Sequence, residues 1–327
     1  MLLTVAVATL SSASCTGASD ATPEPRATSA TSSTGTASTG TASTGSTPTT
    51  ATSTTTTVAS AQTPFAVGTV RPTIVDGARG RELRTIVHYP AVADGDATAA
   101  AAGPFPLVLM AHGYRLPADG YERMLRSLTR RGYVVAAPDF PHTTGNGGDG
   151  NRSDIVNQPG DLVAVLDAIV AGTVPGLPAI AHPDRVAAMG HSDGGLTASA
   201  IAYNTRYRDP RIAAAVVMTG GRALFPGSYF ADGSPPLLAI HGTADETNSI
   251  NASASLFRDL PAGIPAHFVR VEGGSHLGPF MFDTGMPALG EVLADFLDAY
   301  LGPAVDPASV VRLQADASNP PLSIESR

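Results

Sequence analysis

From about residue 64 onward, the apolar positions fall into short runs separated by turn residues. Alternation of apolar and polar residues with period two predicts a strand at 83–90. Continuous apolar runs predict strands buried on both faces at 106–111 and 133–137. The apolar spacing over 121–128, between those two runs, predicts a helix. Strands that alternate with helices in this way indicate βαβ units and a parallel sheet.

The same alternation continues through the second half of the chain. Further strands are predicted at 185–189, 236–242 and 267–271, and helices are predicted over 155–170 and 196–202. The predicted fold class is therefore α/β, with a mostly parallel central sheet and helices on both of its faces. Such sheets bind ligands beyond the carboxyl ends of their strands.

The segment between Met218 and Pro235 is too short to hold a large cap domain. We therefore expect no cap and an open cleft. The expected rim of that cleft is aromatic and consists of Tyr114, Phe225, Tyr229 and Phe230. A segment of this size cannot wall off a long tunnel, which predicts substrates with short to medium acyl chains.

Composition divides the 327 residues into unlike parts. Residues 16–63 are almost entirely Ser, Thr, Ala, Gly and Pro, a composition that buries too little apolar area to offset chain entropy, so a disordered linker is expected there. Residues 64–303 have the length and patterning of one α/β domain. Residues 304–327 are expected to form a C-terminal tail.

The first fifteen residues have the features of a signal peptide, with an apolar stretch too short to span a bilayer and then small residues. The only cysteine, Cys15, follows them. This arrangement resembles the lipobox of bacterial lipoproteins, which implies lipidation of Cys15 and a membrane-anchored, exported protein. The chain departs from the lipobox pattern, since no basic residue precedes the apolar stretch, as a misplaced start codon would explain, and Ser12 stands where an aliphatic residue is usual. Ordinary secretion and an N-terminus without a targeting function stay open as alternatives.

Charge and composition exclude several classes of chemistry. All 20 basic residues are arginine, so a Schiff-base lysine, a Walker-type phosphate loop and a Ser-Lys dyad are ruled out. The net charge of −8 and the lack of a basic run argue against nucleic-acid binding. Cys15 alone can form no disulfide within the chain and leaves the domain without a catalytic cysteine. We expect a monomer with no cofactor and no metal.

The most informative motif is Gly-His-Ser-Asp-Gly-Gly at 190–195. It follows the strand predicted at 185–189 and precedes the helix predicted at 196–202, and a serine on so sharp a turn needs glycine neighbours. This is the pattern of a nucleophile elbow. It makes Ser192 the candidate nucleophile, the alternative being a turn serine in a glycine-rich corner.

Two further residues complete a candidate triad. Asp245 follows the strand at 236–242 and His276 follows the strand at 267–271, which gives the order Ser, Asp, His at the carboxyl ends of strands. His276 would act as the base and Asp245 would orient its ring. A helix cap near Ser249 is the alternative role for Asp245, and Asp139 is the rival acid.

Backbone amides are expected to stabilise the oxyanion of the tetrahedral intermediate. The amide of Asp193 follows the nucleophile directly, and the second is assigned to Tyr114. His112 is expected to shape the loop before Tyr114. His191 is expected to pack beside the elbow, and His241 to form part of the turn that leads to Asp245. The remaining histidines are interpreted as structural or surface residues, namely His88, His142, His182 and His267. The 149–154 loop faintly resembles a calcium loop and is interpreted as solvated.

These residues together resemble the α/β-hydrolase superfamily over roughly 85–300. Within it, the resemblance is to cap-less esterases: the dienelactone-hydrolase-like, chlorophyllase-like, platelet-activating-factor-acetylhydrolase-like and cutinase-like polyester hydrolases. The resemblance implies a serine esterase that works through an acyl-enzyme without a cofactor. The chain departs from the polyester branch, since it lacks tryptophan and a C-terminal cysteine pair and has Asp193 where an apolar residue is common.

The predicted function is an exported serine hydrolase of small-molecule or lipid-like carboxylic esters, using Ser192, His276 and Asp245. An acyltransferase or amidase with the same triad is one alternative. A surface binding module that keeps the fold without catalysis is the other, since fold alone does not fix function.

Overall fold

The computed structural model describes residues 63–282 and 287–327. The expected signal peptide, its Cys15 and all but the last residue of the expected linker lie outside these residues. Ser60–Arg327 forms one compact unit, and the fold below is that of its described part. None of the helices described there combines the length and the apolar character that crossing a membrane requires.

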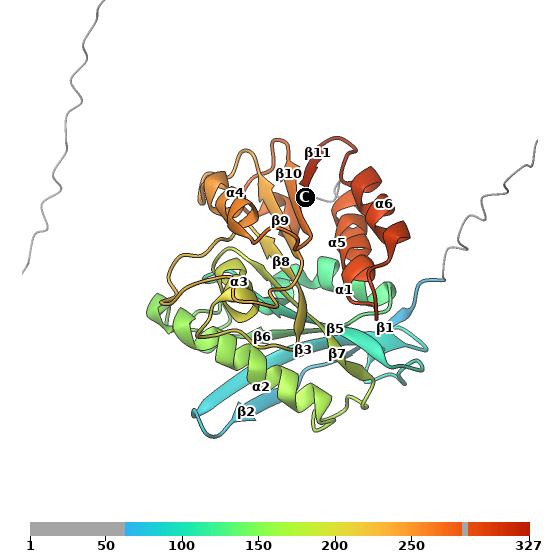
Figure 1. The fold of residues 1–327 in the computed structure, drawn as a ribbon. Helices are drawn as coiled ribbons and strands as arrows, with labels where there is room; N and C mark the ends of the chain where they lie inside the picture. The colour runs from blue at the N-terminus through green and yellow to red at the C-terminus, as the bar shows by residue number, and fades with distance from the viewer. Residues whose placement is uncertain (1–62, 283–286) are drawn as a thin grey trace, which may run out of the picture. The chain divides into compact units, whose positions relative to one another are not determined.

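One sheet of eleven strands runs through the described residues (Figure 1). In chain order the strands are β1 (Ala66–Val70), β2 (Thr73–Asp76), β3 (Arg81–Ala91), β4 (Gly95–Asp96), β5 (Phe105–Ala111), β6 (Val134–Asp139), β7 (Ala181–His191), β8 (Ile212–Met218), β9 (Leu237–Gly242), β10 (Ala266–Val271) and β11 (Leu322–Ser326). Their order across the sheet is β11-β10-β9-β8-β7-β5-β6-β3-β1-β4, with β2 paired to β3. The six central strands from β10 to β6 are mutually parallel, so their carboxyl ends share one edge.

Helices cover both faces of the sheet (Figure 1). They are η1 (Ala118–Tyr121), α1 (Glu122–Arg130), η2 (Arg152–Asn157), α2 (Gln158–Val170), α3 (Asp193–Tyr203), α4 (Ile250–Asp259), the π-helical turn η3 (Gly278–Phe282), α5 (Pro287–Tyr300) and α6 (Pro307–Asp316). Helices α2, α3 and α4 pack on one face, and α1, α5 and α6 pack on the other. This arrangement confirms the predicted fold class, α/β with a mostly parallel central sheet and helices on both faces. The segment between β8 and β9, all of which the structure describes, contains no helix or strand of its own.

Strand β5 shows why its sequence suits the centre of this sheet. Successive side chains of a strand point to opposite faces. Leu107 and Leu109 accordingly join the core under α2 and α3, while Val108 and Met110 join the core under α1 and α5. All four are buried, so an uninterrupted apolar run is what this position requires.

The expectation of a C-terminal tail over 304–327 is wrong. Helix α6 packs against the α5 side of the sheet through Leu313, and β11 extends the sheet by pairing antiparallel with β10. Leu322, the first residue of β11, is buried in the same core. The domain therefore runs to the last residue.

The expected aromatic rim of the cleft is also wrong in part. Phe225 is buried against Ala200 and Ile155 and stacks edge-on with Tyr207. Phe230 packs on Tyr203, the last residue of α3. Since Ser192 precedes the first residue of α3, these contacts lie up to roughly 16 Å from the nucleophile along an eleven-residue helix.

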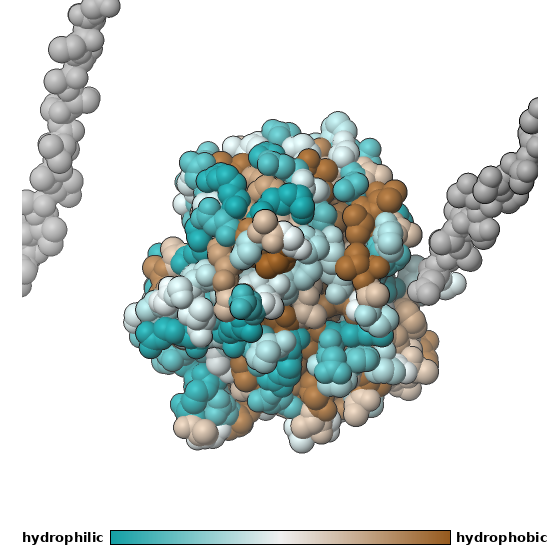
Figure 2. Space-filling view, viewed as in Figure 1, coloured by the Kyte–Doolittle hydropathy of each residue, from teal (hydrophilic) through white to brown (hydrophobic). Residues whose placement is uncertain are grey.

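One face of the domain is shown by hydropathy in Figure 2. Its surface is largely polar, and apolar side chains appear in separate groups, one of them over α5 and α6. Val305 and Val311 are the exposed apolar residues of that C-terminal segment. Scattered exposure of this kind is ordinary for a folded domain.

Candidate active site

Ser192 occupies a strained turn between β7 and α3. Its φ of +58° and ψ of −122° lie outside the regions that a residue with a side chain normally adopts. The turn closes because its neighbours lack side chains. A Cβ on Gly190 would lie 2.0 Å from the Gly194 carbonyl oxygen, and one on Gly194 would lie 2.1 Å from the Ala111 carbonyl oxygen. The glycine pattern therefore sets the position of the serine.

The three residues predicted from chain order lie in one hydrogen-bonded line. The Ser192 hydroxyl is 3.0 Å from Nε2 of His276. On the other side of the ring, Nδ1 of His276 is 2.8 Å from Oδ2 of Asp245. Strands β7, β9 and β10 are neighbours or next neighbours in the sheet, so the loops at their carboxyl ends bring the three side chains together.

Asp245 is held as a carboxylate. Burial alone would raise its pKa, but hydrogen bonds from the backbone amide of Asn248 and from His276 hold that pKa below its usual value. A third bond comes from the amide of Thr247 at 2.8 Å. Besides His276, Oδ2 of Asp245 also contacts Nε2 of His241, at 3.3 Å. These donors fix the carboxylate, so its negative charge is available to orient and stabilise a protonated His276.

The acid is more shielded from water than the base. The side chain of Asp245 is 1% exposed and that of His276 is 12% exposed, while Ser192 is half-buried. The nucleophile and the base are therefore partly open to solvent, which suits a site that a substrate enters from solution.

The two expected oxyanion donors flank Ser192. Asp193 is the first residue of α3, where amides lack intrahelical acceptors. A Cβ on Gly113 would lie 3.2 Å from Cβ of Ser192, which puts the loop of Tyr114 beside the nucleophile. Among the described residues, neither the Asp193 nor the Tyr114 amide has a hydrogen-bond acceptor. Both are free to donate to a ligand.

His112 fixes the loop that carries Tyr114. Its Nδ1 donates to the carbonyl oxygen of Gly113 at 2.8 Å, and its Nε2 accepts from the amide of Phe140 at 3.0 Å. Burial lowers the pKa of His112, which keeps the ring neutral with the proton on Nδ1. His112 therefore shapes this loop, as expected.

The rival acid, Asp139, lies in a different network. It accepts hydrogen bonds from the Ala118 amide at 3.0 Å, the Thr144 hydroxyl at 2.7 Å and the Asn146 side chain at 2.9 Å. These bonds organise the loops after β5 and β6. Of the two candidate acids, Asp245 is the one whose carboxylate contacts His276.

The other histidines make structural contacts. His241 lies at the end of β9 between Ser253 and the Asn248 carbonyl oxygen. His267 lies between Ser326 and Tyr300.

In the 149–154 loop, Asp154 pairs with buried Arg81.

The sequence reasoning placed His191 beside the elbow, but it missed the contacts that His191 and Arg152 make there. His191 and Tyr121 connect the elbow to its neighbouring loops, and Arg152 binds the carboxylate of Asp193 with two nitrogens. The position of His191 next to the nucleophile was a usable signal. No sequence pattern pointed to Arg152.

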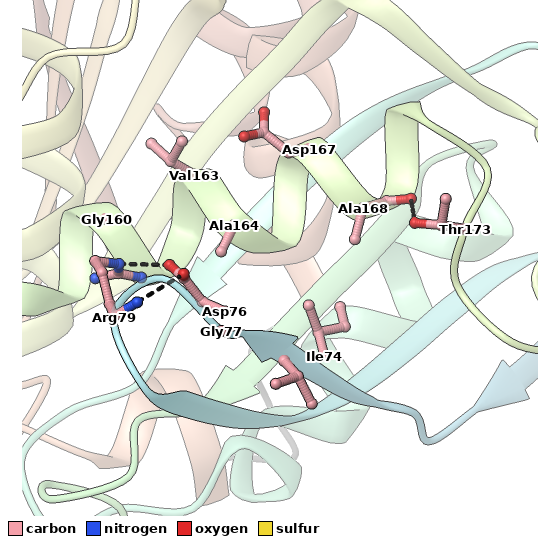
Figure 3. A pocket seen from close by; sticks show the side chains of 11 residues that line it. Ile74, Asp76, Gly77, Arg79, Gly160, Val163, Ala164, Asp167, Ala168 and Thr173 are labelled. Carbon is pink, nitrogen blue, oxygen red and sulfur yellow. Dashed lines mark hydrogen bonds and ion pairs between the residues drawn. The ribbon is translucent and has the colours of Figure 1, made fainter.

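A separate concavity of about 570 Å³ lies between β2 and α2 (Figure 3). An ion pair between Arg79 and Asp76 lies at one end of it, and Ile74 and Ala164 contribute apolar surface. No residue of the candidate triad lines it. It is distinct from the site at Ser192.

Comparison with known proteins agrees with this fold. The family model for chlorophyllase matches residues 96–218, which include β5, the loop of Tyr114 and the elbow at Ser192. The chain belongs to the α/β-hydrolase superfamily. The matched residues of this α/β-hydrolase end before Asp245 and His276, so the assignment of those two rests on their chain order and geometry.

A curated relative is also a chlorophyllase by name. Chlorophyllase-2 of Arabidopsis thaliana is 29% identical to this α/β-hydrolase over 108 residues. Those residues make up 32% of this chain and 32% of the relative, so the similarity spans about a third of the relative's length.

Proposed function

We propose that this α/β-hydrolase is a serine hydrolase that cleaves carboxylic esters through an acyl-enzyme on Ser192. The observation that carries the proposal is the line from the Ser192 hydroxyl through His276 to Asp245, with contacts of 3.0 and 2.8 Å. A serine hydroxyl needs an adjacent base to act as a nucleophile, and this arrangement supplies one. The chlorophyllase match supports action on an ester.

The proposed acylation step follows from these contacts. Nε2 of His276 takes the hydroxyl proton as Oγ of Ser192 bonds to the ester carbonyl carbon. The carbonyl oxygen becomes an oxyanion, to which the Asp193 and Tyr114 amides donate. The intermediate then expels the alcohol, which takes the proton from His276, and an acyl group stays on Ser192.

Deacylation repeats the same proton transfers with water. His276 removes a proton from water as the water oxygen attacks the acyl carbon. The second tetrahedral intermediate releases the carboxylic acid, and the proton on His276 returns to Oγ of Ser192. Throughout both steps, Asp245 stabilises the imidazolium without taking its proton.

The proposed substrates are small-molecule or lipid-like esters with short to medium acyl chains. This proposal is supported by the segment between β8 and β9, which packs on the far end of α3 through Phe230 and Tyr229 and so is directed away from Ser192 in that part. The relative's name refers to chlorophyll, and we take from it the reaction class rather than the substrate.

Export is part of the proposal and is supported by the sequence alone. The apolar stretch before Cys15 has the length of a signal-peptide core, and the cysteine follows small residues. The proposed location is the extracellular side of the cell envelope, with Cys15 as a lipid anchor.

Covalent labelling tests the mechanism. The native enzyme is treated with a fluorescent organophosphate, and its hydrolysis of p-nitrophenyl esters from acetate to palmitate is measured. We expect labelling at Ser192, turnover of the shorter esters, and loss of both in S192A. Labelling elsewhere, or retained turnover in S192A, would contradict the choice of nucleophile.

An added alcohol acceptor separates a hydrolase from an acyltransferase. For the proposed hydrolase, product acid equals released p-nitrophenol with or without the acceptor. An acyltransferase would convert most of the acyl group to a new ester. Absence of labelling and turnover in the native protein would favour the binding module.

A further inference from the structure

The residue after the nucleophile carries a negative charge into the proposed oxyanion site. Asp193 provides one amide for the oxyanion, and its own side chain is 5% exposed. A carboxylate in the first turn of α3 is favoured by the helix dipole. Near a developing oxyanion, however, an uncompensated carboxylate would raise the energy of the tetrahedral intermediate, because like charges repel strongly where water is excluded.

Arg152 compensates that charge with a two-point contact. Its Nε lies 2.7 Å from Oδ2 of Asp193, and one terminal nitrogen lies 2.6 Å from Oδ1. Paired contacts of this kind fix the orientation of both planar groups as well as their separation. The negative charge of the Asp193 carboxylate is therefore balanced by the guanidinium of Arg152, toward which the carboxylate points.

The same guanidinium contacts the second oxyanion residue. Its central carbon lies 5.7 Å from the centroid of the Tyr114 ring, within the range of a cation–π interaction. The Tyr114 hydroxyl in turn donates to the Gly150 carbonyl oxygen at 2.7 Å, two residues before Arg152. Arg152 thus touches both residues whose amides are free at Ser192.

Arg152 is itself positioned by the local structure. It is the first residue of η2, and the preceding Asn151 caps that turn by accepting from the amide of Ser153. Two residues after Arg152, Asp154 is buried in an ion pair with Arg81. The backbone on either side of Arg152 is therefore anchored, although its own side chain is 54% exposed.

We propose that Arg152 is a positioning residue for the oxyanion hole that acts chiefly by cancelling the Asp193 charge, its hold on the orientation of Asp193 and Tyr114 being the smaller part of its effect. The proposal rests on the proposed serine-hydrolase function. It differs from a purely structural role, which would change the stability of the domain and leave kcat of the folded enzyme unaffected. Its main effect is on the transition state, where the negative charge develops.

Four variants test this role with p-nitrophenyl butyrate as the substrate. R152Q leaves the Asp193 carboxylate without its cation, D193N removes the carboxylate, and R152Q/D193N removes both charges. R71Q is the matched control, since Arg71 also pairs with an aspartate, Asp96, and is 53% exposed. Active sites are counted by organophosphate titration, and melting temperatures report on folding.

We expect R152Q to lower kcat by about 10- to 100-fold with little change in KM, which is the signature of an interaction made in the transition state. D193N is expected to lose less than about fivefold. R152Q/D193N is expected to recover most of the activity that R152Q loses, because no uncompensated carboxylate remains. R71Q should match the native enzyme.

Two results would overturn the inference while leaving the serine mechanism intact. One is an R152Q enzyme with native kcat, and the other is a double variant as slow as R152Q. If R152Q does not fold, the comparison of R152Q/D193N with D193N decides, since the inference requires these two to have similar kcat. A native enzyme without turnover or labelling would overturn both proposals.

Discussion

Nε2 of His191 donates a hydrogen bond of 2.8 Å to the backbone carbonyl oxygen of His276. On the other side of the ring, Nδ1 accepts from the Tyr121 hydroxyl at 2.8 Å, and that oxygen accepts from the Gly113 amide at 3.1 Å. Burial lowers the pKa of His191 to about 3, so the ring is neutral. The residue before the nucleophile thus connects the loop of the base with the oxyanion loop.

Replacing His191 by leucine should impair both catalysis and stability. H191L leaves the buried Tyr121 hydroxyl and the His276 carbonyl without this partner, which costs about 1–3 kcal/mol of unfolding free energy. We expect kcat to fall by about tenfold because His276 loses a restraint on its loop. Urea unfolding and p-nitrophenyl butyrate kinetics measure the two effects.

The matched control is H182L, a histidine near the start of the same strand, β7. His182 is half-buried and lies at the opposite end of β7 from the elbow. We expect it to change kcat by less than twofold. Equal kcat in H191L and H182L would show that the His191 contact has no part in catalysis.

Substitution of the two candidate acids distinguishes their roles. D245N should lower kcat by about 10³- to 10⁴-fold, because the amide no longer stabilises the correct tautomer of His276 or its charge. D139N should retain activity within a few fold and lose stability, since Asp139 organises loops through three hydrogen bonds. Steady-state kinetics and thermal melts separate the two, and the reverse pattern would make Asp139 the acid.

The triad could be predicted from sequence because it depends on a topological rule. Ser192, Asp245 and His276 each follow a strand of a parallel sheet, and the carboxyl ends of such strands meet at one edge. The rule brings distant positions together without knowledge of any loop path. The structure places Ser192 and Asp245 on opposite sides of the His276 ring, each within hydrogen-bond distance of it.

The Arg152 contact could not be predicted, because it depends on the path of the loop after β6. That loop turns back at Gly147 and Gly150, both of which have positive φ, before η2 begins. Small changes in such turns move a side chain by many ångströms. The burial of Phe225 was missed for a similar reason, since its segment has no regular element to fix its direction.

The C-terminal strand was missed because its pattern is short. Residues 322–326 alternate over only five positions directly after two prolines, which reads as a loop. Pairing with β10 supplies the stability that the local sequence does not reveal. Edge strands are often of this kind.

Truncating Leu322 should therefore destabilise the whole domain. L322A removes a side chain that is 3% exposed and is expected to lower the unfolding free energy by about 2–4 kcal/mol. The control E325A, on the same strand, removes an exposed partner of Arg270 and should cost less than about 1 kcal/mol. Urea denaturation compares them. If L322A and E325A both lost only a small and equal amount of unfolding free energy, residues 304–327 would be a dispensable tail after all.

Cys15 provides a test of the proposed membrane anchor. In a bacterial host fed an alkyne-bearing palmitate analogue, the native precursor should incorporate the label and fractionate with membranes. C15S should do neither, and S14A is the control that keeps the thiol. Export of unlabelled native protein to the medium would instead indicate ordinary secretion, because a single unlipidated domain lacks the acyl chains that anchoring requires.

Buried histidines should make the domain sensitive to acid. Burial lowers the pKa of His267 to about 4, and its ring contacts the Ser326 and Tyr300 hydroxyls at 2.8 Å each. In the unfolded chain the pKa returns to about 6.5. Between pH 6.5 and 4 the unfolded state therefore binds a proton that the folded state does not, and the unfolding free energy falls as the pH falls.

Replacing His267 should make the unfolding free energy fall less steeply as the pH falls. In H267Q, whose amide can still meet both hydroxyls, the loss of unfolding free energy between pH 7 and pH 4.5 should be smaller than in the native domain by about 1–3 kcal/mol. Urea unfolding at half-unit pH steps measures this difference, with H182Q as the control on a less buried histidine. Parallel curves for H267Q and the native domain would mean that His267 titrates alike in both states, and that its burial between β11 and α5 does not exclude the proton.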